Sequence, residues 1–202
     1  MAGCLAALGI FVLPAVVAGP ASGQGFDADP VAIERYLGAW YEAARTPNDF
    51  EDNTIRRGGT RYGPCYNATA TYALEAPGRI AVLNRCTRGA LEGEATIEDS
   101  VRGEARVIEG SGNRRLSVAF GPGIARFVQR ILFGGEGNYW IYCRGPRAGE
   151  APYQWAVVSG PDKDFVFVLT REKTPDADSL GAIAGCLREE ALPAEDLVWR
   201  QR

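Results

Sequence analysis

Leu37-Gly38-Ala39-Trp40-Tyr41-Glu42-Ala43-Ala44-Arg45 is the stretch that decides the fold. Glycine tolerates positive φ without a Cβ clash, so Gly38 suits a sharp turn into a strand. Trp40, two residues later, opens that strand with a large ring and one N–H group to satisfy. A glycine two residues before a tryptophan also occurs by chance, where the tryptophan is an ordinary core residue. What Gly38 and Trp40 indicate therefore depends on the segments that follow.

The middle of the chain is a series of short strand-like runs separated by Gly and Pro, which is typical of a sandwich or a barrel. A period of two places an apolar set on one face of each run. The chain turns at Glu75-Ala76-Pro77-Gly78 and then returns as a second strand. The inner face is predicted to carry Tyr66, Ala68, Ala70, Tyr72, Leu74, then Ile80, Val82, Asn84, and later Leu116, Val118 and Phe120. Further strands are expected over 137–143, 153–159 and 165–171.

One long helix is expected between Asp176 and Ala191. Asp176 or Asp178 suits its N-cap, and Pro193 stands just beyond its end. An apolar stripe is formed by Leu180, Ile183, Ala184, Leu187 and Ala191. Eight strands followed by one amphipathic helix predict an all-β fold: an eight-stranded antiparallel up-and-down β-barrel with a C-terminal α-helix packed outside. A barrel of about eight strands has room for one small ligand.

The first 23 residues carry no charge, and residues 5–18 are apolar apart from Gly9 and Pro14. With Ala21-Ser22-Gly23 behind it, this run is typical of a signal peptide over 1–23, cleaved near Gly23. Residues 24–202 then form one domain. No Lys or Arg precedes the run, so either the initiator amine serves alone or the sequence starts inside a longer leader. An uncleaved anchor is the alternative, although the run is shorter than the roughly 20 apolar residues of a membrane span.

The cysteines agree with export. Cys65, Cys86, Cys143 and Cys186 are an even set, which predicts two disulfides in an oxidising compartment. We favour Cys65–Cys86, across one hairpin, and Cys143–Cys186, from barrel wall to helix. The strand parity places Cys65 outward and Cys86 inward, so the first pairing needs a bulge near the strand end. Cys4 precedes the apolar run, so no lipidation site is expected in the usual place.

In order and spacing, these segments resemble the lipocalins, in particular the group of bacterial outer-membrane lipocalins and apolipoprotein D. The matching segments are Trp40-Tyr41-Glu42, Arg45-Thr46-Pro47 with Phe50, Thr69 to Leu74 with Gly78, Val82-Leu83-Asn84, Gly93-Glu94-Ala95, Leu116 to Phe120, Tyr139-Trp140-Ile141, Ser159 to Asp162, and Leu169-Thr170-Arg171 ahead of Thr174-Pro175. Glu172 and Lys173 form a small insertion between Arg171 and Thr174. The group also implies an alternative disulfide, from Cys65 to the C-terminal region.

The resemblance implies a structural role for three residues at the closed end of the barrel. Arg171 would lie across Trp40, at the strand that Gly38 opens. A guanidinium within about 6 Å of an indole ring gains roughly 0.5–2 kcal/mol and donates to nearby carbonyls. An exposed arginine at a strand end is the alternative, since arginine is mostly exposed.

The inner-face parity also nominates ligand contacts. Small side chains at Ala68 and Ala70 leave volume unfilled, and ordinary barrel core is the alternative for each position. The expected ligand-binding residues are Ala70, Tyr72, Asn84, Phe120, Trp140 and Tyr142.

The resemblance implies binding and transport of a small hydrophobic ligand, most of all a fatty acid or lysophospholipid. Burying a 16-carbon chain yields on the order of 12 kcal/mol before ordering costs. We expect a periplasmic or secreted monomer or weak homodimer that contacts membranes transiently, without cofactor or metal. The formal charge of −3 gives no reason to expect nucleic acid as a partner.

Two other function classes remain open from sequence. An enzyme of this fold acting on a lipid or isoprenoid would need a reactive group. However, the chain has no histidine, and its cysteines are expected to be paired. Glu42 is the one acidic group expected near the closed end of the barrel. A protein-binding module that uses the rim loops is the third class. No catalytic residue is assigned.

Overall fold

The structure, a computed structural model, describes residues 29–121 and 135–199. The leader predicted over 1–23 and Cys4 lie outside these residues. The helices are α1 (Ile33–Tyr36), α2 (Asp49–Asp52) and α4 (Ala177–Glu189). The strands are β1 (Gly38–Arg45), β2 (Ile55–Arg57), β3 (Thr60–Ala76), β4 (Arg79–Ala90), β5 (Thr96–Val107), β6 (Arg115–Phe120), β7 (Tyr139–Gly145), β8 (Trp155–Ser159), β9 (Val166–Thr170) and β10 (Val198–Trp199).

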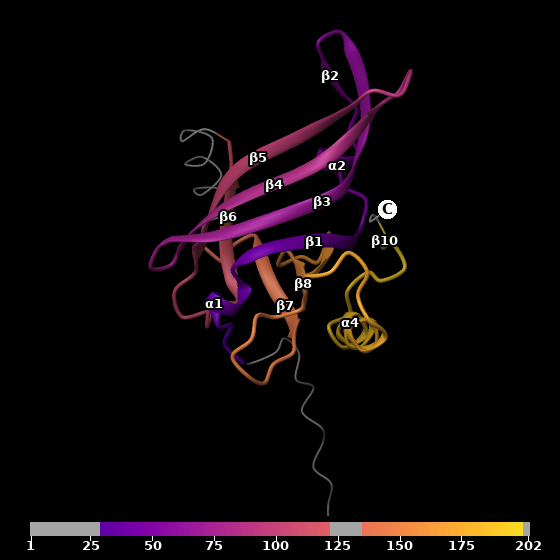
Figure 1. The fold of residues 1–202 in the computed structure, drawn as a ribbon. Coiled ribbons are helices and arrows are strands. Elements are labelled where there is room, and N and C mark those ends of the chain that lie inside the picture. The colour runs from indigo at the N-terminus through magenta and orange to yellow at the C-terminus, as the bar shows by residue number, and fades with distance from the viewer. Residues whose placement is uncertain (1–28, 122–134, 200–202) are drawn as a thin grey trace, which may run out of the picture.

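Eight of these strands close into a barrel. They run in the order β1-β9-β8-β7-β6-β5-β4-β3, and β1 pairs again with β3 to complete the circle. All the pairings are antiparallel, which confirms the predicted architecture. The short strands β2 and β10 add to β3 and β1. In Figure 1 the long strands β3, β4 and β5 cross the molecule and extend past the rest of the barrel.

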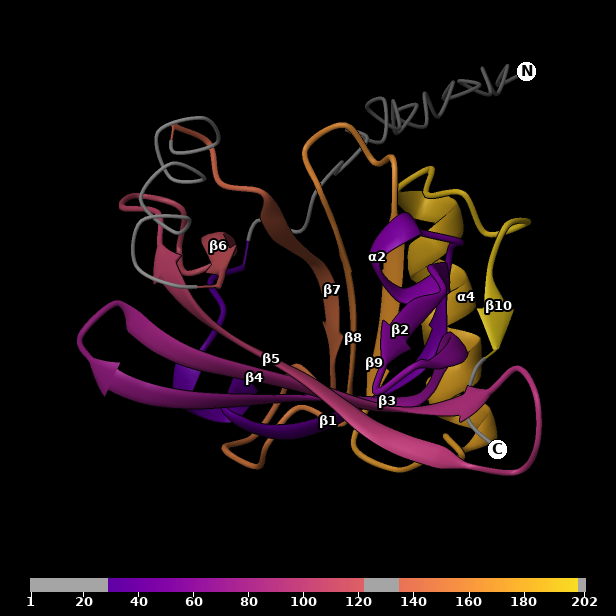
Figure 2. The same ribbon diagram turned by 90° about the horizontal axis from the view of Figure 1, so that it is seen from above.

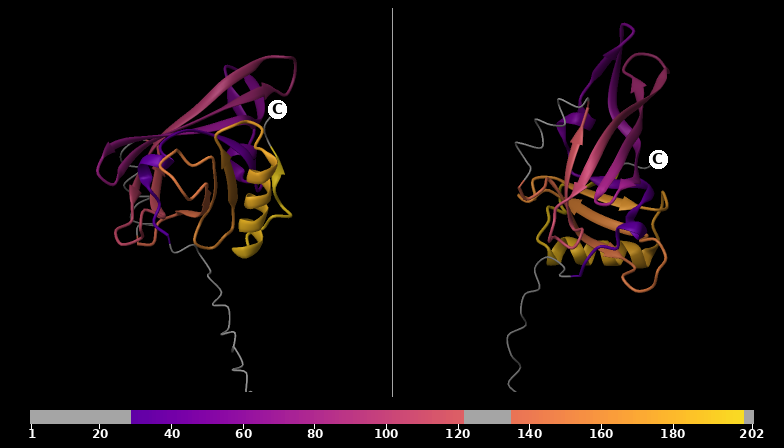
Figure 3. Two further views of the ribbon diagram at one scale, coloured as in Figure 1. Left: turned by 60° about the horizontal axis from the view of Figure 1, so that its bottom comes forward. Right: turned by 90° about the vertical axis from the view of Figure 1, so that its left-hand side faces the viewer.

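The helix α4 lies outside the barrel, against β7 and β8 (Figures 2 and 3). The carboxylate of Asp176 caps it by accepting from the backbone N–H of Ser179 at 2.6 Å. Its buried face is Ile183, Cys186 and Leu187. The predicted stripe was therefore partly wrong, because Leu180, Ala184 and Ala191 are exposed. The bond of Cys186 to Cys143 turns the helix so that Cys186 faces the wall.

Two hydrophobic clusters divide the molecule into an inside and an outside layer. The inner cluster fills the lower barrel around Trp40, Leu116 and Ile141. The outer cluster joins the wall to α4 through Val157, Ile183 and Leu187. Within the described residues, no helix has the length and apolar character needed to cross a membrane.

The two disulfides join Cys65 to Cys86 and Cys143 to Cys186, the pairs favoured from the sequence. The register of β3 against β4 shifts between Tyr66 and Thr69, where Asn67 has φ of +51°. This is the bulge that the first pairing requires. It turns Cys65 toward the same side as Cys86, and both sulfurs lie on the cavity wall.

Candidate functional site: a cavity inside the barrel

The barrel encloses a cavity of about 930 Å³. This volume lies in the upper part of the range for small-molecule sites, about 300–1,000 Å³. Its wall is mainly apolar and aromatic, and its members come from strands all around the barrel. The apolar lining includes Ala68, Ala70, Tyr72, Val82, Val101, Val118, Phe120, Tyr139, Val158, Pro161, Phe165, Phe167 and Leu169.

Four of the predicted ligand-binding residues line this cavity: Ala70, Tyr72, Asn84 and Phe120. The hairpin register brings two of them together, because Ala70 stands opposite Asn84 and Tyr72 stands opposite Val82. Residues directly opposite in an antiparallel pair point to the same face. Alternation and the Pro77-Gly78 turn thus fix this part of the wall.

Phe120 reaches the cavity wall beside a glycine. Gly103 stands opposite Val82 on one side and Phe120 on the other. A Cβ atom at Gly103 would lie 2.6 Å from Cδ1 of Phe120 and 2.6 Å from the carbonyl oxygen of Ala119. The missing side chain therefore gives the ring its space.

Trp140 and Tyr142 do not line the cavity, so the prediction that both side chains face inward was wrong. Both pack into the outer cluster on the side of α4, and the guanidinium of Arg115 lies 4.1 Å from the centroid of the Trp140 ring. The inward residues of β7 are Tyr139 and Ile141. A register shift between Ile141 and Cys143 then puts Tyr142 and Cys143 on the same outer side.

The base of the barrel is closed by Trp40 and Arg171. The indole of Trp40 is fully buried, and its N–H donates to the carbonyl of Tyr36 at 2.8 Å. The guanidinium of Arg171 lies 3.7 Å from the centroid of that ring. Its N–H groups donate to the carbonyls of Ala39 and Tyr153 and to those of residues 35–37. Gly38 has φ of +95°, and a Cβ there would lie 3.3 Å from Nη1 of Arg171.

Three tyrosines meet above this base. The hydroxyl of Tyr139 lies 2.7 Å from that of Tyr36 and 3.0 Å from that of Tyr72. Tyr36 is sealed below the cavity, whereas Tyr72 and Tyr139 line it. Burial raises the pKa of Tyr72 to about 12 and raises those of Tyr36 and Tyr139 well above their ordinary value. All three are therefore neutral hydroxyls at physiological pH.

A buried group of charges forms the wall at the other end of β1. Arg45 is fully buried, and its Nε atom lies 3.0 Å from a carboxylate oxygen of Glu42 and 2.5 Å from one of Glu51. Neither of these two contacts is aligned as a hydrogen bond. The two Nη atoms of Arg45 donate to the carboxylate of Asp52. A register shift between Glu42 and Ala44 brings Glu42 and Arg45 to one side. Glu42 thus faces Arg45 and lines the cavity. Burial raises the pKa of Glu51, against the opposing effect of Arg45.

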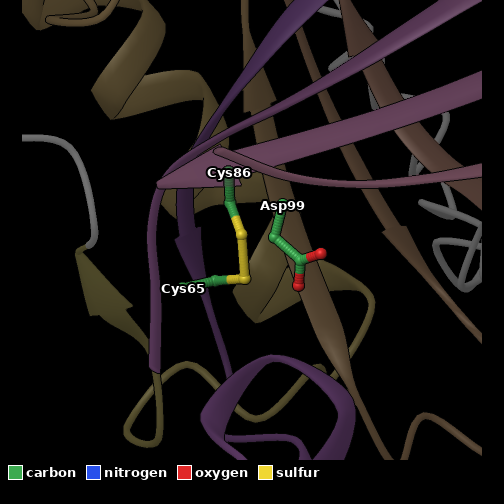
Figure 4. Close-up of side chains that lie close together, drawn as sticks. All are labelled: Cys65, Cys86 and Asp99. Carbon is green, nitrogen blue, oxygen red and sulfur yellow. A yellow bond between two sulfur atoms is a disulfide. The ribbon is translucent and has the colours of Figure 1, made fainter. Parts of the chain in front are cut away.

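Arg88 fastens the segment that carries α2. It donates to the carbonyls of Glu51, Asn53 and Gly63, and it is ion-paired with Asp99 at 2.9 Å. Figure 4 shows Asp99 beside the disulfide, since Asp99 stands opposite Cys86 on the neighbouring strand. Ligand atoms of Cys65, Cys86 and Asp99 lie within 4.8 Å of one another. The two sulfurs are bonded to each other, and the carboxylate of Asp99 is ion-paired with Arg88 and Arg57.

Tyr36, Tyr139 and the charges around Arg45 were not predicted from the sequence. Residues 139–142 are Tyr-Trp-Ile-Tyr, an apolar run without alternation, so periodicity does not separate its two faces. The spacing gave no signal for the charged group. Glu42 and Arg45 are three residues apart, so on a regular strand they would point to opposite faces, and only the bulge brings them to one side.

The comparisons with known proteins agree with this architecture. The family model described as "Lipocalin-like domain" matches residues 31–202. The chain is 28% identical over 171 residues to the outer membrane lipoprotein Blc of Vibrio cholerae, with 84% of this chain and 82% of that protein covered. It is 30% identical over 143 residues to temperature-induced lipocalin-1 of Arabidopsis thaliana, and the match covers 69% of this chain and 62% of that protein.

Solved structures show the same fold at low sequence identity. Insecticyanin from the tobacco hornworm Manduca sexta superposes with a TM-score of 0.54 at 11% identity, covering 89% of this chain and 85% of that one. Lobster apocrustacyanin A1 superposes with a TM-score of 0.51 at 12% identity, covering 84% of this chain and 78% of that one. With a family model over most of its length and a closed barrel around a cavity, the chain belongs to the lipocalin family.

Proposed function

We propose that this lipocalin binds and carries a long-chain lipid, a fatty acid or a lysophospholipid, inside its barrel. The observation that carries the proposal is the cavity of about 930 Å³ with its apolar and aromatic wall. Each buried CH₂ group contributes about 0.8 kcal/mol, so such a wall holds an alkyl chain without help from charge.

A periplasmic or secreted location completes the proposal. The two disulfides suit an oxidising compartment. The bacterial relatives from Vibrio cholerae and Citrobacter freundii are named as outer membrane lipoproteins, which supports a place in the cell envelope.

Binding without catalysis fits the chemistry of the cavity. The chain has no histidine, and the cysteines on the cavity wall are joined in a disulfide. The carboxylates of Glu42 and Glu51 are held by Arg45.

The test is displacement of an apolar fluorescent dye from the purified protein by hexadecanoic acid and by a lysophosphatidylcholine. We expect saturable displacement at one site per chain, and native mass spectrometry should detect lipid that co-purifies. Absence of saturable dye binding and of co-purifying lipid would contradict the proposal and favour a protein-binding role for the rim loops.

A further inference from the structure

The tyrosines on the cavity floor carry one hydroxyl proton more than their own contacts can use. Tyr36, Tyr72 and Tyr139 have three O–H groups, and each can donate one hydrogen bond. The two contacts at Tyr139 use two of these protons. Among the described residues, the third proton has no acceptor.

The spare proton belongs at the cavity side of the chain of hydroxyls. If Tyr36 kept it, a donor with no partner would be sealed beneath the floor, because Tyr36 has no exposed surface. Such a buried donor costs a lost hydrogen bond. Tyr36 therefore donates to Tyr139, and the spare proton lies on Tyr139 or on Tyr72. Both of these residues line the cavity.

Asn84 presents a second unmatched polar group to the same space. Its Oδ1 is buried and accepts no hydrogen bond from any described residue. Because Ala70 is opposite Asn84 and Tyr72 is opposite Val82, Asn84 lies one diagonal step from Tyr72 along the hairpin. The lower wall thus offers a donor and an acceptor to whatever fills it.

The lower wall offers no free cation to an anionic group at this position. The lining arginines, Arg85 and Arg88, follow Asn84 along β4, away from Tyr72. Below the floor, the N–H groups of Arg171 are taken by backbone carbonyls. A carboxylate brought down to the tyrosines would lose its water without gaining a cation.

We infer that the ligand has an uncharged oxygen at its buried end, which accepts a hydrogen bond from Tyr72 or Tyr139. This inference rests on the proposed function and narrows it. The preferred class is a long chain with a hydroxyl or carbonyl oxygen remote from its charged head. The head then stays at the open end, where water remains available.

The experiment compares hexadecanoic acid with its ω-hydroxy derivative, two probes that differ by one hydroxyl. Both are titrated by dye displacement on the full-length mature protein. We expect the ω-hydroxy acid to bind about 3- to 10-fold more tightly, the gain of one net hydrogen bond. An equal or weaker affinity for the ω-hydroxy acid overturns the inference, because a hydroxyl on an apolar floor loses its water without compensation.

Variants locate the effect. The double variant Tyr72→Phe/Tyr139→Phe removes both hydroxyls that line the cavity and should abolish the preference. Tyr142→Phe is the matched control, since Tyr142 is a buried tyrosine of β7, like Tyr139, but does not line the cavity, and its hydroxyl already donates to the carbonyl of Gly160. A preference that survives in the double variant overturns the inference. If that variant does not fold, the comparison on the unaltered protein still decides.

The two proposals fail in different ways. If neither acid displaces the dye, the carrier function fails and the inference fails with it. If both acids displace it but the hydroxyl brings no gain, the carrier function stands and the inference alone is lost.

Discussion

Arg171 joins parts of the chain that are more than 130 residues apart in sequence, because it donates to the carbonyls of Leu37, just before β1, and Ala39, within β1, and stacks on Trp40. Arg171→Lys keeps the charge but loses the planar fork that serves several carbonyls at once. We expect the free energy of unfolding to fall by roughly 2–4 kcal/mol in urea titrations. Arg102→Lys, at an exposed position of β5, is the control and should stay within about 0.5 kcal/mol. An equally small change in Arg171→Lys would show that the base does not depend on the fork.

Phe120 and Trp140 are the residues at which sequence parity succeeded and failed. Phe120→Ala removes a ring from the cavity wall and should weaken fatty-acid binding about tenfold in dye displacement. Trp140→Ala should leave the affinity unchanged while lowering stability, since the ring packs on the outer cluster. The reverse result would place Trp140 inside the barrel.

The difference between these two residues has a physical cause. Phe120 belongs to an alternating strand, where Leu116, Val118 and Phe120 share one face. Trp140 lies in a run of four apolar residues that alternation cannot divide. In addition, β6 ends at Phe120 and β7 begins at Tyr139, which are too far apart in sequence for the register to be read from a hairpin turn. The sequence therefore predicted the wall on β3, β4 and β6 and missed it on β7.

At the scale of elements, α2 is held to the barrel by charge. Its Glu51 meets Arg45 on β1, and Arg88 donates to the backbone carbonyls of Glu51, within α2, and of Asn53, directly after it. The raised pKa of Glu51 means that the folded protein binds this proton more tightly than the unfolded chain does. The contribution of Glu51 to stability is therefore present at low pH and is lost as pH rises above its ordinary value of 4.5.

Glu51→Gln tests this linkage, because the amide does not titrate. We expect the free energy of unfolding to fall less steeply between about pH 4.5 and 7 in the variant than in the unaltered protein. Asp176→Asn is the control. The pKa of Asp176 is lowered by hydrogen bonds from Ser179, so its carboxyl is ionised throughout this window. A slope that Glu51→Gln leaves unchanged would assign the pH dependence to other carboxyls.

At the scale of the whole molecule, the barrel is part core and part container. The turn signals and the alternation predicted eight closing strands and an outer helix, since both depend on local chemistry. The strands β2 and β10 were not predicted, although β2 joins β3 through the two-residue turn Gly58-Gly59. The register shift at Ala43 was not predicted either, because it arises where β1 must fit the distant strand β9. The bulge at Asn67 was expected near the strand end only because the Cys65–Cys86 pairing requires it. The charged group around Arg45 is assembled by one of these shifts.

An alanine-to-phenylalanine substitution, made once in the cavity wall and once in the packed core, tests which part of the barrel interior is open to a ligand. Ala70 lines the cavity, whereas Ala105 is fully buried in the inner cluster and does not line it. Ala70→Phe adds a ring to open space, so lipid affinity should fall at least about tenfold while the free energy of unfolding holds or rises. Ala105→Phe should instead lower the free energy of unfolding by about 1–3 kcal/mol, because a close-packed site cannot accept the ring without strain. Dye displacement and urea unfolding of both variants measure the two effects. If Ala70→Phe destabilises the protein as much as Ala105→Phe does, the space beside Ala70 is closed core and the lipid does not reach it.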